Sequence, residues 1–305
     1  MLITPQTSHW MAGYGFRDRP SDGKETGLYA KALALEDTHG KRLVIVTFDL
    51  STVPRALRGS LQKRSAETYQ LPPEGLLLNA SHTHSGPEQS GRRMAEAADS
   101  RRAKLAAEYS QQLEEKLHTL IGQSLAKLEH ARLGYAHARA GFAMNRRLPA
   151  PQGFVNKDNP DGPVDHAAPV LRVTGADGGL RAVLFGYACH NTTLSLYPWN
   201  ADYAGYAQEY VQAAHPGVVA LFMSGCGGDQ NPYPRRTANR RQHSTLAKIG
   251  AGQQNPPRMS SSIPPSTPGK VWQPPAPEDL APELPAYEIL GLLGRGGMGA
   301  VYKAR

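Results

Sequence analysis

Four short apolar runs constrain the fold of this 305-residue chain more than any other feature of its sequence. They are RLVIVTFDL (42–50), GLLLNA (75–80), RAVLFGYACH (181–190) and GVVALFMSG (217–225). The runs are rich in Val, Leu, Ile and Phe without strict alternation of apolar and polar residues, which is typical of strands covered on both faces. They predict an α/β protein with a mixed sheet and covering helices.

A long helix is predicted between the second and third runs, from about residue 92 to 130. Apolar residues recur there at three- and four-residue steps, with Glu, Lys and Gln between them, so one side of the helix faces the core. These residues are Leu105, Tyr109, Leu113, Leu117, Leu120, Ile121, Leu125 and Leu128. Residues 145–168 are rich in Pro, Asp and Asn and predict a long loop.

Composition divides the chain into three regions. Residues 1–236 carry the α/β pattern, and ten prolines between Pro256 and Pro285 mark residues 237–285 as a disordered, proline-rich linker. Strand pattern returns in residues 286–305, where we expect a short terminal β-hairpin.

The charge distribution argues against a nucleic-acid partner. Residues 1–234 carry 24 Lys and Arg against 22 Asp and Glu, whereas residues 235–305 carry 10 against 4, so most of the net charge of +8 lies in the tail. No apolar run is long enough for a transmembrane segment, and no signal peptide is visible at the N-terminus, which predicts a cytoplasmic chain as written. The two cysteines form no CxxC pair, so they leave the redox compartment open.

Polar residues follow each of the four predicted strands, and in α/β proteins binding sites form beyond the carboxyl ends of strands. The first run ends at Asp49, the second leads to His82 and His84, the third ends at His190, and Asp229 follows the fourth. An i, i+2 spacing in extended chain places the two imidazoles of His82 and His84 on one side, which suits a Zn²⁺ ion. The alternative for any one of these histidines is an ordinary core or surface side chain.

Several segments, in order, resemble the neutral/alkaline non-lysosomal ceramidase family. They are MAGYG (11–15), LYAKALALED with VIVTFDL, NASHTHSGP (79–87), MNRRL (144–148), YACHNTTL (187–194) and DYAGYA (202–207). The family consists of zinc-dependent amidases that split the N-acyl bond of ceramide, and many members are secreted or associated with membrane surfaces. The resemblance therefore implies a lipid or small-molecule amide as substrate and a zinc-activated water as nucleophile.

The resemblance also implies roles for individual residues. His82 and His190 would be zinc ligands, and His84 and Arg146 would polarise the reacting centre. Asn231 stands where the family has a serine. The family completes its zinc site with a glutamate and a tyrosine farther downstream, and the resemblance stops near Arg236, so we expect weak zinc binding and impaired turnover. The alternative is a catalytically dead remnant or binding module.

The last twenty residues resemble the glycine-rich loop of serine/threonine protein kinases. Gly294, Gly296, Gly299 and Val301 match its pattern, in which glycines let the backbone approach the phosphates of ATP. ATP would be a cofactor only if the kinase part were complete. A further alternative is thus a kinase fragment, or a fusion whose sensor is the hydrolase-like domain.

These boundaries predict the course of limited proteolysis. The proline-rich linker can bury few side chains to offset ordering entropy of about 1–2 kcal/mol per residue. We therefore expect the first cuts between about residues 237 and 285, leaving a core near residues 1–236, as measured by mass spectrometry of the fragments. First cuts inside residues 40–225 would contradict this domain boundary.

Overall fold

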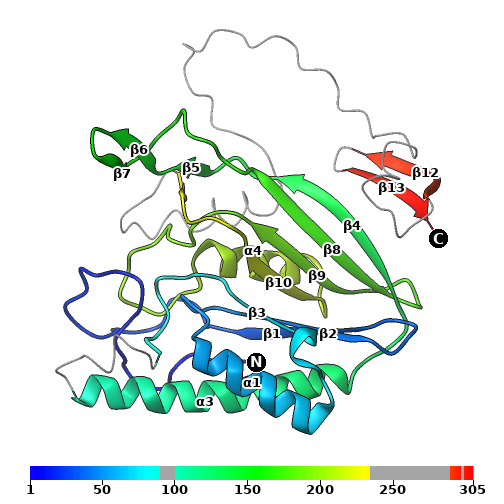
Figure 1. Cartoon of the computed structure of the whole chain (residues 1–305), viewed down its shortest axis with the longest axis horizontal. Helices are drawn as coiled ribbons and strands as arrows, with labels where there is room; N and C mark the ends of the chain where they lie inside the picture. The colour runs from blue at the N-terminus through cyan, green and yellow to red at the C-terminus, as the bar shows by residue number, and fades with distance from the viewer. Residues whose placement is uncertain (90–99, 234–288, 297–298, 305) are drawn as a thin grey trace.

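The computed structural model describes residues 1–89, 100–233, 289–296 and 299–304. Figure 1 shows four layers in the body of the protein. Helices α1 (Arg55–Tyr69) and α3 (Ser100–Leu125) cover a first sheet, a second sheet packs on the other face of the first, and α4 (Asp202–Ala214) packs against the second sheet. The predicted α/β class with mixed sheets and covering helices is confirmed.

The first sheet has the strand order β1–β2–β3. Strands β1 (Ala30–Glu36) and β2 (Arg42–Phe48) form an antiparallel hairpin, and β3 (Leu76–Ala80) runs parallel to β2. The chain passes from β2 to β3 through α1 and the short 3₁₀ helix Pro73–Gly75. This crossover places the carboxyl ends of β2 and β3 at the same edge.

The second sheet has the strand order β10–β9–β8–β4. Strands β9 (Leu180–Tyr187) and β10 (Val219–Ser224) are parallel, and α4 lies between them in the chain. Strands β8 (Ala167–Gly175) and β4 (Ala131–Arg139) continue the sheet antiparallel. The four apolar runs of the sequence thus correspond to β2, β3, β9 and β10.

The apolar core has one part at each contact between layers. On β10, Leu221 and Phe222 point to opposite faces of the sheet, so Leu221 enters the contact between the sheets and Phe222 enters the contact with α4. Buried members include Phe48, Leu61, Leu113 and Leu117 under the helices, Leu33, Ile45, Leu184 and Leu221 between the sheets, and Tyr203, Ala204 and Phe222 under α4.

Helix α3 buries the apolar side that the sequence predicted. Tyr109, Leu113, Leu117 and Ile121 are buried against the first sheet. The helix ends at Leu125, before the predicted residue 130, and residues 90–99 lie outside the described part of the chain. Leu128, the last residue of the predicted apolar stripe, is beyond the helix and partly exposed.

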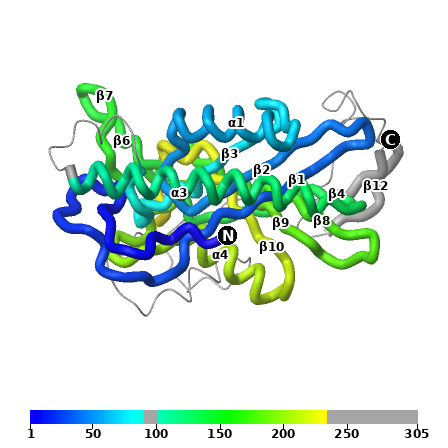
Figure 2. The backbone as a smooth tube through the Cα atoms, turned by 90° about the horizontal axis from the view of Figure 1, so that it is seen from below, coloured from blue at the N-terminus to red at the C-terminus, as the bar shows by residue number. Residues whose placement is uncertain are grey.

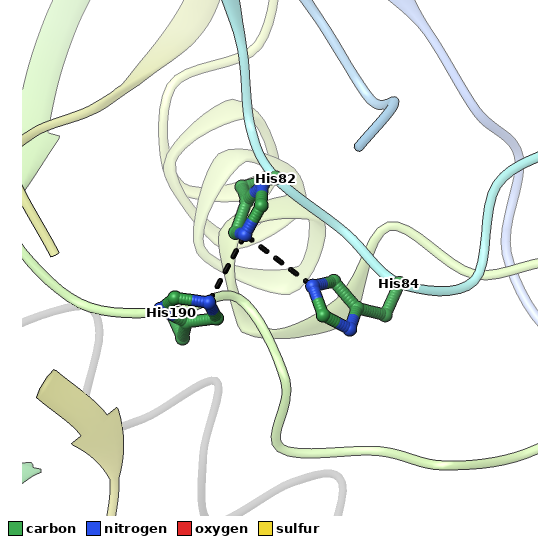
Figure 3. Close-up of side chains that lie close together, drawn as sticks. All are labelled: His82, His84 and His190. Atoms are coloured by element: carbon green, nitrogen blue, oxygen red, sulfur yellow. Dashed lines mark hydrogen bonds between the residues drawn. The ribbon is translucent and has the colours of Figure 1, made fainter. Parts of the chain in front are cut away.

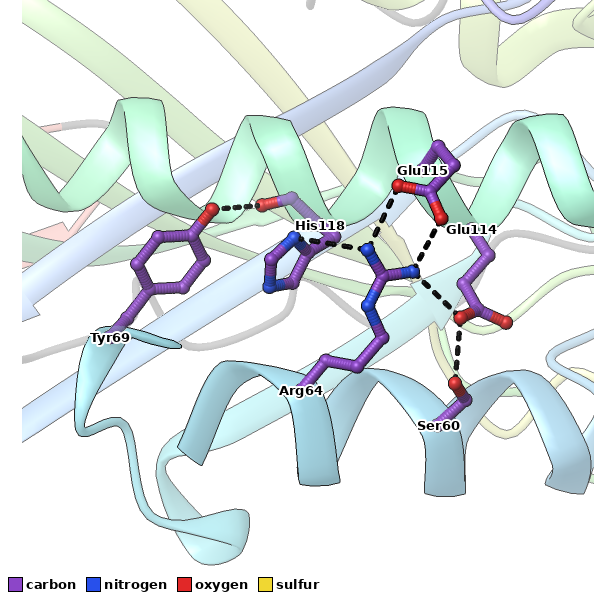
Figure 4. Close-up of polar contacts among 6 residues, drawn as sticks. All are labelled: Ser60, Arg64, Tyr69, Glu114, Glu115 and His118. Atoms are coloured by element: carbon purple, nitrogen blue, oxygen red, sulfur yellow. Dashed lines mark hydrogen bonds and ion pairs between the residues drawn. The ribbon is translucent and has the colours of Figure 1, made fainter. Parts of the chain in front are cut away.

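Helices α1 and α3 lie side by side on the first sheet (Figure 2) and share a polar cluster (Figure 4). Arg64 donates to Glu114 and to both carboxylate oxygens of Glu115, each at 2.8 Å. Tyr69 stacks on the imidazole of His118 with ring centroids 4.8 Å apart. Because solvent-accessible ion pairs contribute only about 0–1 kcal/mol each, this cluster fixes the alignment of the two helices more than it adds stability.

The prediction of one long loop over residues 145–168 is wrong in part. Strands β6 (Arg147–Ala150) and β7 (Gly153–Asn156) form a hairpin there, and β5 (Ala143–Asn145) pairs with β11 (Gln230–Pro232). Pro151 and Gln152 form the turn between the strands, and Gly153, the first residue of β7, has a φ of +116°, which glycine adopts readily.

Strands β12 (Ile289–Gly296) and β13 (Gly299–Ala304) pair antiparallel, as expected for a terminal hairpin. The predicted linker, residues 237–285, lies outside the described residues. Among the helices of the described residues, none combines the length and the apolar character needed to cross a membrane.

The layer structure predicts the effect of truncating Leu117. This side chain is fully buried between α3 and the first sheet, so Leu117→Ala should lower the free energy of unfolding by about 2–5 kcal/mol in urea titrations. Leu128→Ala removes the same atoms from a position that is 36% exposed, and it should change the stability far less. Equal losses in both variants would contradict the packing of α3 described above.

Candidate metal centre

Three histidine side chains meet beyond the carboxyl ends of β3 and β9 (Figure 3). The Nε2 atom of His82 lies 3.1 Å from Nε2 of His190 and 3.3 Å from Nε2 of His84. Ligand nitrogens in a tetrahedral zinc site are about 3.3 Å apart when each lies about 2.0–2.1 Å from the metal. The three imidazoles therefore have the spacing of a metal-binding group.

Two backbone carbonyls fix the tautomers of His82 and His190. Nδ1 of His82 lies 2.6 Å from Ser51 O, and Nδ1 of His190 lies 2.7 Å from Gly227 O. Because a carbonyl oxygen can only accept, both Nδ1 atoms carry hydrogen, and in the neutral rings both Nε2 atoms present lone pairs. The lone pair of His190 Nε2 faces Arg146 Nη2 as well as His82, a cation between the rings would accept both lone pairs, and metal-binding histidines are commonly oriented by such carbonyls. These residues fit a divalent cation.

The backbone at His82 is held in an unusual conformation. Its φ of 63° lies in the left-handed region, which costs a residue other than glycine about 1–3 kcal/mol. The His82 N–H donates to Leu50 O at 2.9 Å, so the turn is tied to the end of β2 while the ring reaches Ser51. At this turn the strained residue is the one that points its side chain at the cluster.

The ring of His84 packs directly against Gly13, where any larger residue would collide with it. A Cβ atom on Gly13 would lie 2.3 Å from His84 Cγ, and Gly13 has a φ of +95°. The ring of Tyr14 packs edge-on against His84 with centroids 4.8 Å apart, and Arg17 donates to His84 O. Burial, assisted by the neighbouring histidines and arginines, lowers the pKa of His84 to about 3, so its imidazole is neutral at neutral pH.

Arg146 places a fixed positive charge beside the histidines. Its Nη2 lies 3.1 Å from Nε2 of His190, and its Nε and Nη2 donate to Gly228 O at 3.0 and 2.8 Å. Its Nη1 donates to Asn231 Oδ1 at 3.2 Å. The guanidinium is therefore oriented by the loop after β10 and can stabilise negative charge that develops near the cluster.

A pocket of about 360 Å³ opens at the cluster, with His82 and His190 in its wall. Its other side is formed by Ser224, the last residue of β10, and by residues 225–228 of the loop that follows. A Cβ atom on Gly227 would lie 2.5 Å from the backbone nitrogen of Cys189, so this loop can approach the end of β9 only because position 227 is glycine. A second groove of about 360 Å³ shares Ser224, Gly225 and Cys226 with the pocket and continues over the second sheet.

The residues predicted from the sequence to form the site, His82, His84, His190 and Arg146, lie together. Asp49 and Asp229 also follow strands, but neither belongs to the histidine group in the described part of the chain. Asp49 is buried and accepts from the Tyr29 N–H at 2.9 Å, and burial raises its pKa to about 6. Asp229 contributes its backbone carbonyl, which accepts from the Arg146 N–H at 2.7 Å.

Sequence reasoning missed the residues that support the histidines. Ser51 and Gly227 act through backbone carbonyls, which no side-chain pattern reveals. Asn200 and Asp202 are both fully buried beside the site, although only Asp202 falls within a segment that resembles the family, DYAGYA (202–207). Asn200 and Asp202, on either side of Ala201 where α4 begins, were a usable signal, because helix starts commonly carry such residues.

Comparison with known proteins identifies the class to which this fold and site belong. A model of the N-terminal part of neutral/alkaline non-lysosomal ceramidases matches residues 3–244. The chain therefore belongs to the neutral/alkaline non-lysosomal ceramidase family. The comparison with curated proteins returned no match.

Two solved structures have a similar fold. One is the neutral ceramidase from Pseudomonas aeruginosa, with a TM-score of 0.66 and 21% identity, and the other is a ceramidase complexed with C2, with a TM-score of 0.67 and 22% identity. Each alignment covers 82% of this chain and 41% of the solved chain. The present chain thus spans less than half the length of either structure.

The kinase resemblance of residues 286–305 finds no support in these comparisons. In the terminal hairpin Gly294 is opposite Val301, and Gly296 is opposite Gly299. This register places the glycine pattern at the turn of a hairpin, but it demonstrates neither a kinase nor an ATP site.

The environment of His84 predicts a pH dependence of stability. Its pKa is about 3 in the folded protein and about 6.5 when unfolded, so the unfolded state binds more protons between these values. The His84 contribution is therefore constant above about pH 7.5, where the imidazole is neutral in both states, and is lost as the pH falls towards 3. In metal-free protein, the stability of the wild type relative to His84→Gln should decrease between about pH 7.5 and 5 in urea titrations.

Asp49 acts in the opposite sense, because its raised pKa makes the folded state bind more protons as the pH falls. Asp49 is present in both proteins, so the difference in stability between the wild type and His84→Gln cancels its contribution. Parallel pH profiles for the wild type and His84→Gln would show that His84 is not buried as a neutral ring.

Proposed function

We propose that this chain carries the histidine portion of a zinc-dependent amidohydrolase of the ceramidase type, which cleaves the N-acyl linkage of ceramide or a related amide. The observation that carries the proposal is the pair of Nε2 lone pairs of His82 and His190, 3.1 Å apart, with both tautomers set by backbone carbonyls. Membership of the ceramidase family supports the same chemistry.

Each residue of the cluster has a distinct role in this proposal. His82 and His190 would hold the zinc ion, with His84 Nε2 beside them. A zinc ion bound there supplies an acidified water and polarises a carbonyl group. The guanidinium of Arg146 stabilises the oxyanion that forms when the amide carbonyl is attacked, and neutral His84 supplies a polar ring nitrogen that does not repel a cation.

The second groove supports a substrate with an aliphatic chain. It begins at Ser224, Gly225 and Cys226, which also line the pocket at the histidines, and it continues along apolar side chains of the second sheet. These include Leu171, Leu184, Phe185 and Met223. An amide held at the cluster could therefore lay its acyl chain along an apolar wall, where burial contributes about 0.8 kcal/mol per methylene.

Because Asn231 stands where the family has a serine, the substrate amide has to be identified by assay. Its Oδ1 accepts from Arg146, so it orients the guanidinium and is not a nucleophile. This arrangement supports water as the attacking group. A ceramide analogue and a short N-acyl amide should both be assayed, because the pocket chemistry does not depend on a sphingoid base.

The proposal also includes the boundaries of three regions of the chain. We assign residues 1–236 to the ceramidase-like unit, 237–285 to a linker and 286–305 to a separate hairpin. The kinase reading of that hairpin depends only on its glycine spacing and register.

Zinc content tests the proposal directly. Equilibrated with excess zinc, the wild-type protein should bind about one Zn²⁺ per chain with weak affinity, and a double His82→Ala, His190→Ala variant should bind none, because both oriented imidazoles are gone. The matched control is the double variant His39→Ala, His137→Ala, which removes two exposed histidines and should bind zinc as the wild type does. Equal zinc in all three proteins would end the proposal.

Turnover provides the second arm of this test. Release of fatty acid should be lost in His82→Ala and reduced about 10²–10³-fold in Arg146→Ala at unchanged zinc content, as expected on removal of an oxyanion donor. Zinc binding without hydrolysis in the wild type would instead support the catalytically dead remnant.

A further inference from the structure

The two histidine segments belong to different sheets. His82 and His84 follow β3 in the first sheet, and His190 follows β9 in the second. Residues 200–202, at the start of α4, lie between these segments and bond to both. The proposed chemistry does not use this buried polar junction.

Asp202 binds the segment that leaves His190. Its Oδ1 accepts from the Thr193 N–H at 3.0 Å, and its Oδ2 accepts from the Leu194 N–H at 2.8 Å. Oδ1 also accepts from the Tyr203 N–H at 2.7 Å, which ties the same carboxylate to the first turn of α4. Only 1% of Asp202 is exposed, so solvent competes little for these three bonds.

Asn200 binds the segment that carries His82 and His84. The hydroxyl of Thr83, the residue between the two histidines, donates to Asn200 O at 2.9 Å. The Asn200 N–H donates to Ser85 O at 3.2 Å. Asn200 Oδ1 accepts from the Asp202 N–H at 3.2 Å, so the two halves of the junction are joined.

The junction contains a strained residue. Asp202 has a φ of 55°, in the left-handed region that residues other than glycine rarely adopt. Burial raises the pKa of its carboxyl group, and the backbone N–H donors oppose that shift. A strained and desolvated carboxylate is destabilising by itself, and such features persist where the surrounding contacts determine them, often beside functional sites.

We propose that Thr83, Asn200 and Asp202 form a positioning clamp that sets the relative placement of the three imidazoles. None of the three is proposed to bind the metal. They fix the two backbone segments from which the rings project, and so they maintain the Nδ1 hydrogen bonds of His82 and His190 to Ser51 O and Gly227 O. The inference rests on the proposed metal site for its functional meaning, but the placement of the rings can be measured without metal.

The test uses three variants. Thr83→Val removes the hydroxyl at nearly constant volume, and Thr83→Ser keeps it. Asp202→Asn replaces one hydrogen-bond acceptor by a donor. In metal-free wild type, long-range ¹H–¹⁵N NMR spectra should show His82 and His190 as single tautomers with hydrogen on Nδ1. Thr83→Val and Asp202→Asn should give mixed tautomers, and Thr83→Ser should resemble the wild type.

Metal binding is the second measurement. Titration with Co²⁺ should show affinity about 10–100-fold weaker in Thr83→Val and Asp202→Asn, together with altered visible absorption bands, as is typical when groups that orient metal ligands are removed. The matched control is Tyr109→Phe, which removes a buried hydrogen bond to Ile3 O from the core under α3. It should lower stability and leave the tautomers and the Co²⁺ spectrum unchanged.

The outcomes separate the two proposals. Unchanged tautomers and Co²⁺ affinity in Thr83→Val would overturn the clamp, whether or not the wild type binds metal. Mixed tautomers in Thr83→Val with no Co²⁺ bound by the wild type would support the clamp and refute the metal site. If Asp202→Asn fails to fold, the comparison of Thr83→Val with Thr83→Ser decides.

Discussion

A pair of hydrogen bonds through one side chain joins the two sheets at the point on which the histidine cluster depends. Nδ2 of Asn79 donates to Ser224 O at 3.0 Å, and its Oδ1 accepts from the Ser224 N–H at 2.9 Å. Asn79 lies on β3 three residues before His82, and Ser224 ends β10, the parallel neighbour of β9, which leads to His190. The amide of Asn79 thus extends the hydrogen bonding of one sheet into the other, and it limits how far the sheets can slide where the imidazoles must meet.

The site combines buried polar groups with strain, and the apolar layers stabilise both. Thr83, Asn191, Asn200 and Asp202 have almost no exposure, and each takes part in hydrogen bonds to the backbone. The positive φ angles at His82 and Asp202 are unfavourable locally. The three apolar cores between the layers supply the compensating stability, and they reach the site itself, because Ala201 belongs to the core under α1 and α3 and Cys189 and Tyr203 belong to the core under α4.

The parts of the fold that sequence reasoning predicted are those with strong local patterns. The strands β2, β3, β9 and β10 are continuous apolar runs, and α3 has a regular buried side. Strands β4 and β8 were missed because ARLGYAHAR is largely exposed and AAPVLRVTG contains a proline. Helix α1 was missed because only Leu57, Leu61 and Ser65 of its fifteen residues are buried. The β6–β7 hairpin was hidden by the Pro and Asn residues around its turn.

The sequence by itself determined which side chains could form a site, because histidines and an arginine follow strands or short loops and match the motifs of one family. Only the tertiary structure decided what those side chains can do. The 3.1 Å approach of His82 and His190 depends on the packing of two sheets, the tautomers depend on carbonyls of distant residues, and the neutrality of His84 depends on burial under Gly13 and Tyr14. The physical reason is that protonation state and ligand spacing are set by contacts between segments up to 145 residues apart, which no local pattern encodes.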